Sequence, residues 1–401
     1  MKRIILSFAL VGLVIFGVNA QKAAKPAPHT VRLHKTGGAQ RTEILLPQVK
    51  GFNVYKGDFH VHTSYSDGSV NPAGRIVEGW LDGLDIIAIT DHYENHNGIK
   101  KFLKVTAPYN EDGQPTAYIN TTKANRVAAD FNAIHAEAEA QIKKGNYPML
   151  LIKGCEMARN AKTHGHFNCL FLKDLNGLYH KDMAEAFRKV KAQGGIVIHN
   201  HPAWRRDTSD KTPFHEQVYK EGLIDGVEVV NGFSFYPHIV RRCVDEKLTM
   251  FANTDIHSVS TYTRMPAEPF RTMTLVLAKE LTEKSVKEAI LKHRTLAYMS
   301  GNVIGKEEWL AELLNASIDC RVVLEDKEKG TRKFQITNFS SIPYSLRRGK
   351  KIYTVEPFKS VFVTIGKEKD SKKYAAPKFT VENMWHVDYK HPVVVLDIDK
   401  K

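Results

Sequence analysis

The sequence predicts an α/β fold in which a mostly parallel sheet, open or closed, is followed by a small β domain. Strand-like and helix-like segments alternate between residues 51 and 310, which is typical of parallel strands joined by helices. Histidines and carboxylates recur directly after apolar, strand-like runs, where the active sites of α/β barrels lie. Residues 311–401 carry short strand-like segments without long helices between them, which indicates a small β-sandwich.

The chain begins with a segment typical of an export signal. Lys2 and Arg3 precede an almost wholly apolar run over residues 4–18, and Ala20 is a small residue suited to cleavage. The run is short for a membrane helix, which needs about 20 apolar residues. We therefore expect a signal peptide over residues 1–20, a periplasmic or secreted mature protein, and no membrane span after cleavage. Prolines and glycines in residues 21–50 predict a linker.

The alternating elements of residues 51–310 amount to about 250 residues, which suits a single barrel. Asn71-Pro72 predicts a helix start, because asparagine caps helices and proline favours the first helical position. The expected helices are 71–82, 123–144, 181–193 and 282–293, and the expected strands are 84–90, 147–155, 167–172, 196–198, 226–230, 248–253, 272–278 and 295–299. In the β domain, strands are expected at 319–325, 333–338, 360–365 and 392–398.

Charge and cysteines exclude some classes of function. The formal net charge is +14, but the surplus is spread along the chain without a dense basic block. This is typical of a lysine-rich solvated surface, so no nucleic-acid partner is expected. The four cysteines form no C-x-x-C pair, so a structural zinc site is disfavoured and free buried thiols are expected. Nothing in the sequence indicates an oligomeric state.

Four short segments contain histidines and carboxylates of the kinds that bind metals: DFHVH (58–62), TDH (90–92), NHP (200–202) and TDIH (254–257). His60 and His62 are two residues apart on a strand, so their side chains share one face and suit one ion. Asp255 and His257 repeat this spacing. Because the ends of successive strands converge in a barrel, these segments together predict a multi-metal hydrolase.

Further candidate ligands lie beside other strands. Glu156 ends an apolar strand and can bridge two ions with its two oxygens, and Asp67 lies in a turn that Gly68 can sharpen. Asp91 is a candidate for orienting a ligating imidazole next to His92. Two pairs are ambiguous from the residues alone, namely His164 with His166 and His199 with His201.

These motifs resemble the PHP (polymerase and histidinol phosphatase) superfamily of metal-dependent phosphoesterases. The matching segments extend over about 200 residues in the expected order: DFHVHTSYSDG (58–68), GLDIIAITDH (83–92), GCE (154–156), GHFNCLF (165–171), NHPAW (200–204), GVEVVNG (226–232) and NTDIH (253–257). The branch that contains secreted organophosphate phosphodiesterases and carbaryl hydrolase relatives looks most similar.

The resemblance implies a distorted seven-stranded (β/α) TIM-like barrel that holds two or three divalent ions, such as Mn²⁺, Zn²⁺ or Fe²⁺. It implies a first ion at His60, His62, Glu156 and Asp255, a second at Glu156, His166 and His201, and a third at Asp67, His92 and His257. It favours His166 over His164 and His201 over His199. No organic cofactor is implied.

The resemblance also implies hydrolysis by a hydroxide that bridges two ions, with a small anionic organophosphate as substrate. His199 and Arg205 are candidates for substrate or proton contacts, and Arg205 with Arg206 could clamp a phosphoryl oxygen. Trp204 could wall the pocket or pack in the core, and packing is the expectation. A phosphodiesterase is the leading expectation, and the alternatives are a phosphomonoesterase, an amide or carbamate hydrolase, and a binding module without activity.

Overall fold

The computed structural model describes residues 40–93, 119–121, 125–127, 131–263, 270–368 and 373–399. Residues 41–401 group into one compact unit. The predicted signal peptide and the first part of the predicted linker lie outside the described residues. No described helix is long and apolar enough to cross a membrane.

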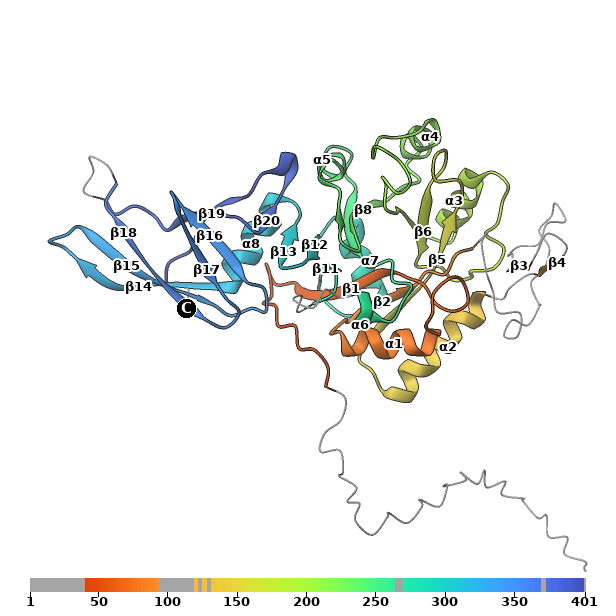
Figure 1. Cartoon of the computed structure of the whole chain (residues 1–401), viewed down its shortest axis with the longest axis horizontal. Helices are drawn as coiled ribbons and strands as arrows, with labels where there is room; N and C mark the ends of the chain where they lie inside the picture. The colour runs from red at the N-terminus through yellow and green to blue at the C-terminus, as the bar shows by residue number, and fades with distance from the viewer. Residues whose placement is uncertain are drawn as a thin grey trace, which may run out of the picture. The chain divides into compact units, whose positions relative to one another are not determined.

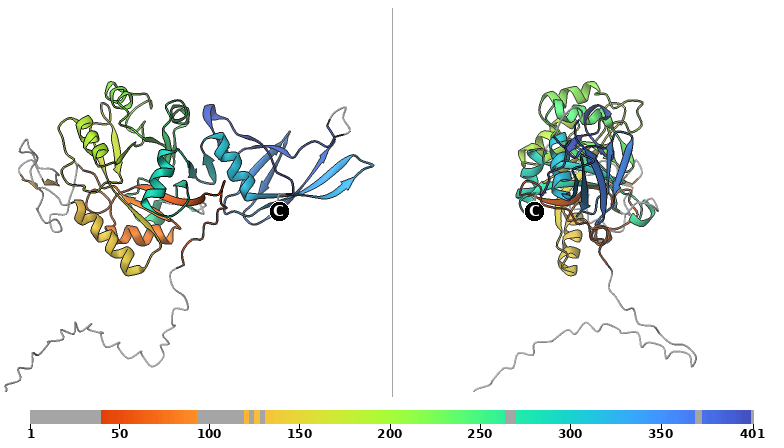
Figure 2. Two further views of the ribbon diagram at one scale, coloured as in Figure 1. Left: turned by 180° about the vertical axis from the view of Figure 1, so that it is seen from behind. Right: turned by 90° about the vertical axis from the view of Figure 1, so that its left-hand side faces the viewer.

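Twelve strands form one large sheet (Figures 1 and 2). Their bounds are β1 Asn53–Val61, β2 Ile86–Ile89, β5 Leu150–Ala158, β6 His166–Leu170, β7 Ile196–His199, β8 Gly226–Asn231, β9 Ser234–Phe235, β10 Thr249–Asn253, β11 Met273–Ala278, β12 Thr295–Met299, β13 Asn302–Ile304 and β20 Met384–Trp385. They pair in the order β10-β8-β7-β6-β5-β2-β1-β11-β12-β13-β20, and β9 pairs with β8.

The sheet is mixed, because β6 runs antiparallel to both of its neighbours, β5 and β7. Only residues 159–165 separate β5 from β6, and a parallel connection needs a dozen residues or more. The groups β1-β2-β5 and β7-β8-β10 are parallel, as predicted.

The sheet curls so that the chain after β10 returns to β1. Val61 forms a parallel bridge with Ile256, and the amide of Asp255 donates to the carbonyl of His60 at 3.0 Å. This arrangement confirms the predicted fold class, a distorted TIM-like barrel. It also brings the ends of β1 and β10, with their predicted ligands, to the same place.

Eight helices are described: α1 Pro72–Leu81, α2 Phe131–Gly145, α3 Met183–Ala192, α4 Pro213–Lys220, α5 Pro237–Asp245, α6 Ser260–Thr263, α7 Glu283–Leu291 and α8 Glu307–Ser317. Helix α1 begins as predicted, since the side chain of Asn71 accepts from the amide of Gly74 at 2.7 Å. Figures 1 and 2 show α1 and α2 side by side.

The predicted helix 123–144 begins later than expected. Asn125–Val127 forms strand β4, which pairs with β3 (Ile119–Thr121), and the helix begins at Phe131. The alanines and glutamates after Phe131 carry the helical signal, whereas the local β pairing overrides it before that point.

Residues 41–50, which the sequence assigned to a linker, pack against the body of the protein. Arg41 pairs with Asp85 at 2.8 Å, and Ile44 and Val49 are buried. Burial of these apolar side chains is a sufficient physical reason for the order of this segment.

The C-terminal region forms two further sheets. One has the order β14-β15-β18 and the other β17-β16-β19-β21. The strands are β14 Ile318–Asp326, β15 Thr331–Asn338, β16 Tyr344–Arg348, β17 Lys351–Val355, β18 Ser360–Gly366, β19 Lys378–Val381 and β21 Val393–Val395, with a short 3₁₀ helix at Val387–Tyr389. The predicted small β domain is therefore present, and the predicted boundary at 310/311 falls inside α8.

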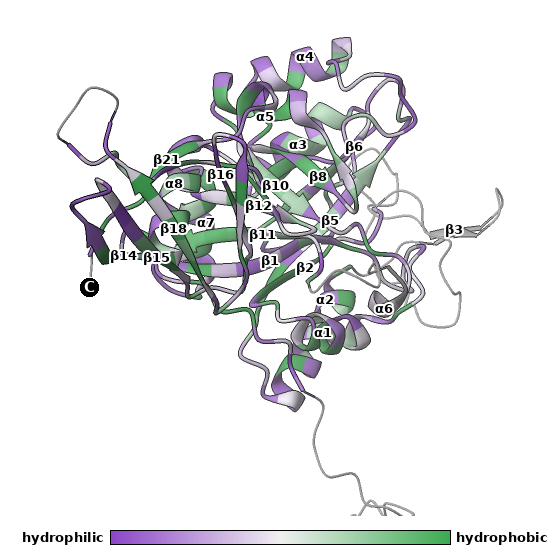
Figure 3. Cartoon of the chain, turned by 60° about the vertical axis from the view of Figure 1, so that its left-hand side comes forward, coloured by the Kyte–Doolittle hydropathy of each residue, from purple (hydrophilic) through white to green (hydrophobic). Residues whose placement is uncertain are grey.

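Apolar side chains fill the interior of the large sheet. Figure 3 shows hydrophobic colour on the central strands and both colours on α4 and α5. All four cysteines are free and buried, as expected. Cys155 and Cys169 face each other across β5 and β6, among the apolar residues of the core.

Candidate metal centre

The structure brings all nine predicted ligands together at one end of the sheet. They come from β1, from the loops after β1, β2, β7 and β10, and from the adjoining ends of β5 and β6. The set is His60, His62, Asp67, His92, Glu156, His166, His201, Asp255 and His257.

His60 and His62 point to the same side of β1, as their spacing predicted. Their Nε2 atoms are 3.1 Å apart, and each lies 3.1 Å from Oδ1 of Asp255. Both imidazoles are fully buried. Two ring nitrogens and a carboxylate oxygen therefore converge on a small volume that suits a cation.

Glu156 lies in the middle of the cluster. Its Oε1 is 3.3 Å from Nδ1 of His166 and 3.4 Å from Nε2 of His201. Its Oε2 is 2.7 Å from Nδ1 of His92. The two oxygens thus face different imidazoles, as expected of a carboxylate that bridges two ions.

A third group forms around Asp67 in the turn after β1. Its carboxylate lies 3.3 Å from Nε2 of His92 and 3.1 Å from Nε2 of His257. The turn needs a glycine, because a Cβ at Gly68 would lie 2.7 Å from the carbonyl of His62. This group is half-exposed, whereas the ligands on β1 are buried.

The arrangement fits divalent cations. The described donors form four overlapping groups with ligand atoms within 4.8 Å of one another. Nδ1 of His92 and Oε2 of Glu156 are buried and lie 2.7 Å apart as an ion pair, but neither atom forms a well-directed hydrogen bond to another described residue. A cation bound to both atoms would satisfy them. The groups are His62/Asp67/His92/His257, His60/His201/Asp255, His60/His62/Glu156 and Glu156/His166/His201.

Charge coupling within the cluster is strong. Burial would lower the pKa of His92, but the carboxylates of Glu156 and Asp67 outweigh it and raise the pKa to about 10. Burial would raise the pKa of Glu156, but the imidazoles of His92 and His60 hold it well below its usual value. Protonated imidazoles therefore balance the carboxylates when no cation is bound, and a divalent cation would displace those protons.

Two of the nine residues hold an unusual backbone conformation. His201 has φ 23° and Asp255 has φ 54°, in the left-handed region that favours glycine. Strained backbone of this kind collects at functional sites, where the surrounding structure maintains it.

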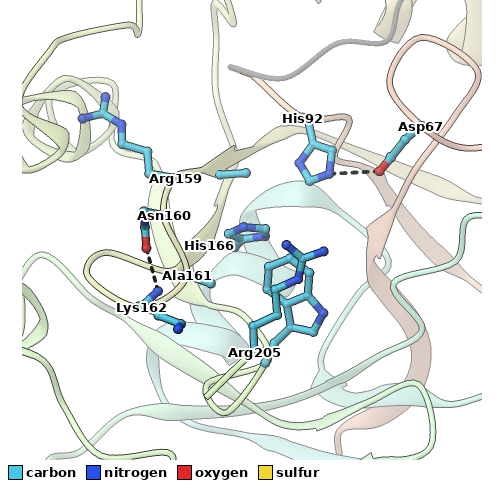
Figure 4. A pocket seen from close by; sticks show the side chains of 10 residues that line it. Asp67, His92, Arg159, Asn160, Ala161, Lys162, His166 and Arg205 are labelled. Atoms are coloured by element: carbon cyan, nitrogen blue, oxygen red, sulfur yellow. Dashed lines mark hydrogen bonds and ion pairs between the residues drawn. The ribbon is translucent and has the colours of Figure 1, made fainter.

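A pocket of about 670 Å³ opens beside the cluster (Figure 4). Asp67, His92 and His166 line its inner side, and residues 158–162 with Trp204 and Arg205 line the rest. Trp204 is 40% exposed, and its ring lies 4.7 Å from that of His166. The expectation that Trp204 packs in the core was therefore wrong, since the loop after β7 projects it to the surface as a wall of the pocket.

Comparison with solved structures identifies relatives of the chain. A two-domain protein from Bacteroides vulgatus, containing a predicted PHP-like metal-dependent phosphoesterase, is 30% identical with a TM-score of 0.77. The match covers 90% of this chain and 99% of that one. The chain belongs to the PHP-like metal-dependent phosphoesterases.

More distant structures include a putative metal-dependent phosphoesterase from Bifidobacterium adolescentis, 14% identical with a TM-score of 0.37. It matches over 59% of this chain and 96% of that one. An amidohydrolase from Chromobacterium violaceum is 13% identical with the same TM-score, over 51% of this chain and 88% of that one. At these TM-scores neither likeness bears on the activity. No protein-family model and no curated protein matches the chain.

Several buried polar groups that the sequence did not single out contact the predicted ligands or the segments that carry them. The side-chain amide of Asn200 donates to Oε1 of Glu156 at 2.8 Å. Oε1 of Glu228 forms a hydrogen bond with Nδ1 of His60 at 2.8 Å. Asp58 pairs with Arg271 and accepts from the amide of Thr254 at 3.1 Å. Two signals in the sequence could have marked Glu228: its charge inside the apolar run GVEVV, and its place in the PHP-like segment GVEVVNG (226–232).

Asp91 contacts an imidazole less directly than expected. Its carboxylate accepts from the hydroxyls of Ser66 at 2.5 Å and Thr63 at 2.6 Å, and Ser66 lies 3.3 Å from Nδ1 of His62. Asp91 therefore shapes the turn after β1 and reaches His62 through Ser66.

His164 and His199 lie outside the cluster. His199 is 2% exposed, stacks on Phe167 and bonds through Nδ1 to the hydroxyl of Tyr219 at 2.8 Å. His164 contacts Phe214 and the hydroxyl of Thr163. The buried position of His199, on the side of the sheet that faces α4, gives it a packing role instead of the substrate contact considered from the sequence.

The side chains of the adjacent residues Arg205 and Arg206 point in different directions. Arg205, with φ 53°, lies over Trp204 at 4.5 Å and lines the pocket. Arg206 donates to the backbone carbonyls of Pro202 and Asp210. Figure 4 shows Arg205 beside His166, with the guanidinium of Arg159 directed away from it. Of the predicted pair, only Arg205 lines the described pocket.

Proposed function

We propose that the protein is an exported phosphodiesterase that uses divalent cations to hydrolyse small organic phosphodiesters. The observation that carries the proposal is the nine-residue donor cluster, which opens directly into a pocket with cationic side chains on its outer part. Among the described residues that line this pocket, Asp67 is the one carboxylate, and it also belongs to the donor cluster.

The residues present fit two or three ions, with Mn²⁺, Zn²⁺ and Fe²⁺ as candidates for mixed imidazole and carboxylate donors. Bound at these groups, such ions supply Lewis-acid polarisation of a phosphoryl oxygen and lower the pKa of water. The protein fixes the ligands: Asn200 holds Glu156, and the curl of the sheet brings Asp255 to His60.

The pocket residues would bind and orient the substrate. Stacking on Trp204 holds the guanidinium of Arg205, so the cation is preorganised to contact a phosphoryl oxygen. Trp204 excludes water from one side of the ester. A volume of about 670 Å³ lies within the range of small-molecule sites and leaves room for an organic group on each side of phosphorus, which favours a diester.

The test compares kcat/KM for bis(4-nitrophenyl) phosphate and 4-nitrophenyl phosphate in protein loaded with Mn²⁺ or Zn²⁺. We expect the diester to react faster and Arg205→Gln to lower its kcat/KM roughly 10- to 100-fold, the worth of a hydrogen bond to a charged group. Arg206→Gln is the matched control, because Arg206 bonds to backbone carbonyls instead of lining the pocket.

Other outcomes would redirect the proposal. Faster turnover of the monoester would make the protein a phosphomonoesterase. Turnover of a naphthyl carbamate alone would make it an amide or carbamate hydrolase.

Export is proposed from the N-terminal segment alone. Fractionation of the source cells, followed by N-terminal sequencing of the mature chain, should give a periplasmic or secreted protein that begins near Gln21. A chain that retains Met1 in the cytoplasm would contradict export and would leave the phosphodiesterase proposal intact.

A further inference from the structure

We propose that Glu228 is a positioning residue of the metal centre. It holds ligands that lie on or directly after three strands, and it determines which ring nitrogen of His60 carries the proton. This inference rests on the metal site proposed above. Glu228 lies in β8 and is fully buried, and its position keeps it out of the nine-residue donor cluster.

One oxygen of Glu228 acts on His60. Oε1 lies 2.8 Å from Nδ1 of His60 and accepts from the side-chain amide of Asn253 at 2.9 Å. A carboxylate at this distance accepts a hydrogen bond from Nδ1, which therefore carries the proton. The lone pair of Nε2 then points to the side where Asp255 and Glu156 lie, at 3.1 Å and 3.3 Å. This is the tautomer that a cation bound through Nε2 requires.

The other oxygen of Glu228 acts on the loops after β7 and β10. Oε2 accepts from the backbone amide of His201 at 2.7 Å and from the side-chain amide of Asn231 at 2.8 Å. Asn231 also donates to Oδ2 of Asp255 at 3.3 Å. His201 and Asp255 are the two ligands with left-handed backbone. Glu228 contacts His201 directly and reaches Asp255 through Asn231, so it supports the two residues whose conformation most needs support.

A carboxylate is required at this position, because all four partners present a hydrogen-bond donor. A glutamine has one acceptor oxygen and one donor nitrogen, so one side of it would face two donors. If the amide nitrogen faced His60, Nδ1 would have to accept and the proton would move to Nε2, where the cation binds. If it faced His201, the strained loop would lose its anchor.

The experiment measures metal affinity by competition with a fluorescent chelator, using Zn²⁺ as the probe, for wild type, Glu228→Gln and Asp225→Asn. Asp225 is a matched control, since it precedes β8, is largely buried, pairs with Lys191 at 2.7 Å and accepts from the amide of Val197. We expect Glu228→Gln to weaken Zn²⁺ binding about 10- to 100-fold, as is usual for such outer partners. Asp225→Asn should change Zn²⁺ affinity less than about threefold while lowering the melting temperature of the metal-free protein.

A second readout does not depend on how well the variant folds. In the Zn²⁺-loaded wild type, the Nδ1 proton of His60 should give a slowly exchanging, downfield proton resonance, assigned by its loss in His60→Ala. In Glu228→Gln this resonance should move upfield or disappear. Absence of the resonance in the wild type would overturn the inference even if Glu228→Gln did not fold.

Equal Zn²⁺ affinity in the wild type and a folded Glu228→Gln variant would also overturn it, and would leave Glu228 a packing role. Failure of the wild type itself to bind Zn²⁺ or Mn²⁺ would instead contradict the proposed function, so the two failures are distinguishable.

Discussion

Glu156 shows how a single side chain can organise the centre. Its Oε1 faces His166 at the start of β6, and its Oε2 faces His92 in the loop after β2. The side-chain amide of Asn200, in the loop after β7, donates to Oε1 and orients it. The sequence identified Glu156 because a carboxylate at the end of an apolar strand is unusual. It did not identify Asn200 as the partner of Glu156, because an asparagine beside a histidine has many ordinary explanations and its partner lies 44 residues away.

His215 makes the stability of the fold depend on pH. It is buried in the capping box of α4, where Nδ1 accepts from the amide of Thr212 and Nε2 donates to the carbonyl of His164. Burial lowers its pKa to about 4. The folded pKa is below the unfolded value of about 6.5, so the contribution is complete above pH 6.5 and is lost as the pH falls towards 4.

We therefore expect the wild type to lose roughly 3 kcal/mol of stability relative to His215→Gln between pH 6.5 and pH 4. Glutamine at this position can retain the capping box without titrating. Urea unfolding of both proteins across this range provides the measurement. Parallel pH profiles would show that His215 does not titrate in this way.

At the scale of elements, the turn after β1 links a backbone constraint to a ligand. The amides of Ser66 and Gly68 both donate to the carbonyl of Thr63, which folds the turn tightly and brings Asp67 back towards His92. The sequence predicted this turn from Gly68. The later start of α2 could not be predicted, because it depends on the pairing of β4 with β3. The antiparallel direction of β6 was not predicted, although the short connection after β5 was a signal for it.

Gly68→Ala should displace this turn, because the new Cβ would lie 2.7 Å from the carbonyl of His62. We expect the half-exposed group of Asp67, His92 and His257 to bind its cation about 10-fold more weakly, with a loss of about 1–3 kcal/mol in stability from overpacking. Gly366→Ala is the control, since a Cβ there would meet only the carbonyl of Gly330 at 3.9 Å. Metal titration and thermal melts of both variants would measure these effects. Equal metal affinity and equal melting temperature in the two variants would show that the turn tolerates a side chain at position 68.

At the scale of the whole molecule, the large sheet includes a strand from near the C-terminus. β20 pairs with β13, and Arg241 of α5 forms an ion pair with Asp388. The presence of a small β domain could be predicted from the short strand-like segments without long helices between them. The pairing of β20 with the large sheet could not be predicted. Only two residues of β20 take part in it, and 79 residues separate the end of β13 from the start of β20.

Metal removal should destabilise the whole chain, because the ligands come from distant segments that a cation ties together. One ion present at 100 times its Kd adds about 2.7 kcal/mol, or a rise of about 4 °C in Tm for a chain of this length. Thermal melts with and without a chelator test this expectation. His60→Ala should respond less to the chelator, and an unchanged Tm in the wild type would show that cations do not stabilise the fold.

We infer that the nine-residue cluster is a multi-metal centre that hydrolyses phosphoesters. The metal content of the purified mature protein, measured together with hydrolysis of bis(4-nitrophenyl) phosphate for wild type and His60→Ala, tests this inference. We predict two or three ions per chain in the wild type, with fewer ions and at least a 10-fold lower activity in the variant. A wild type that binds no metal even after reconstitution with Mn²⁺ or Zn²⁺ would contradict the claim.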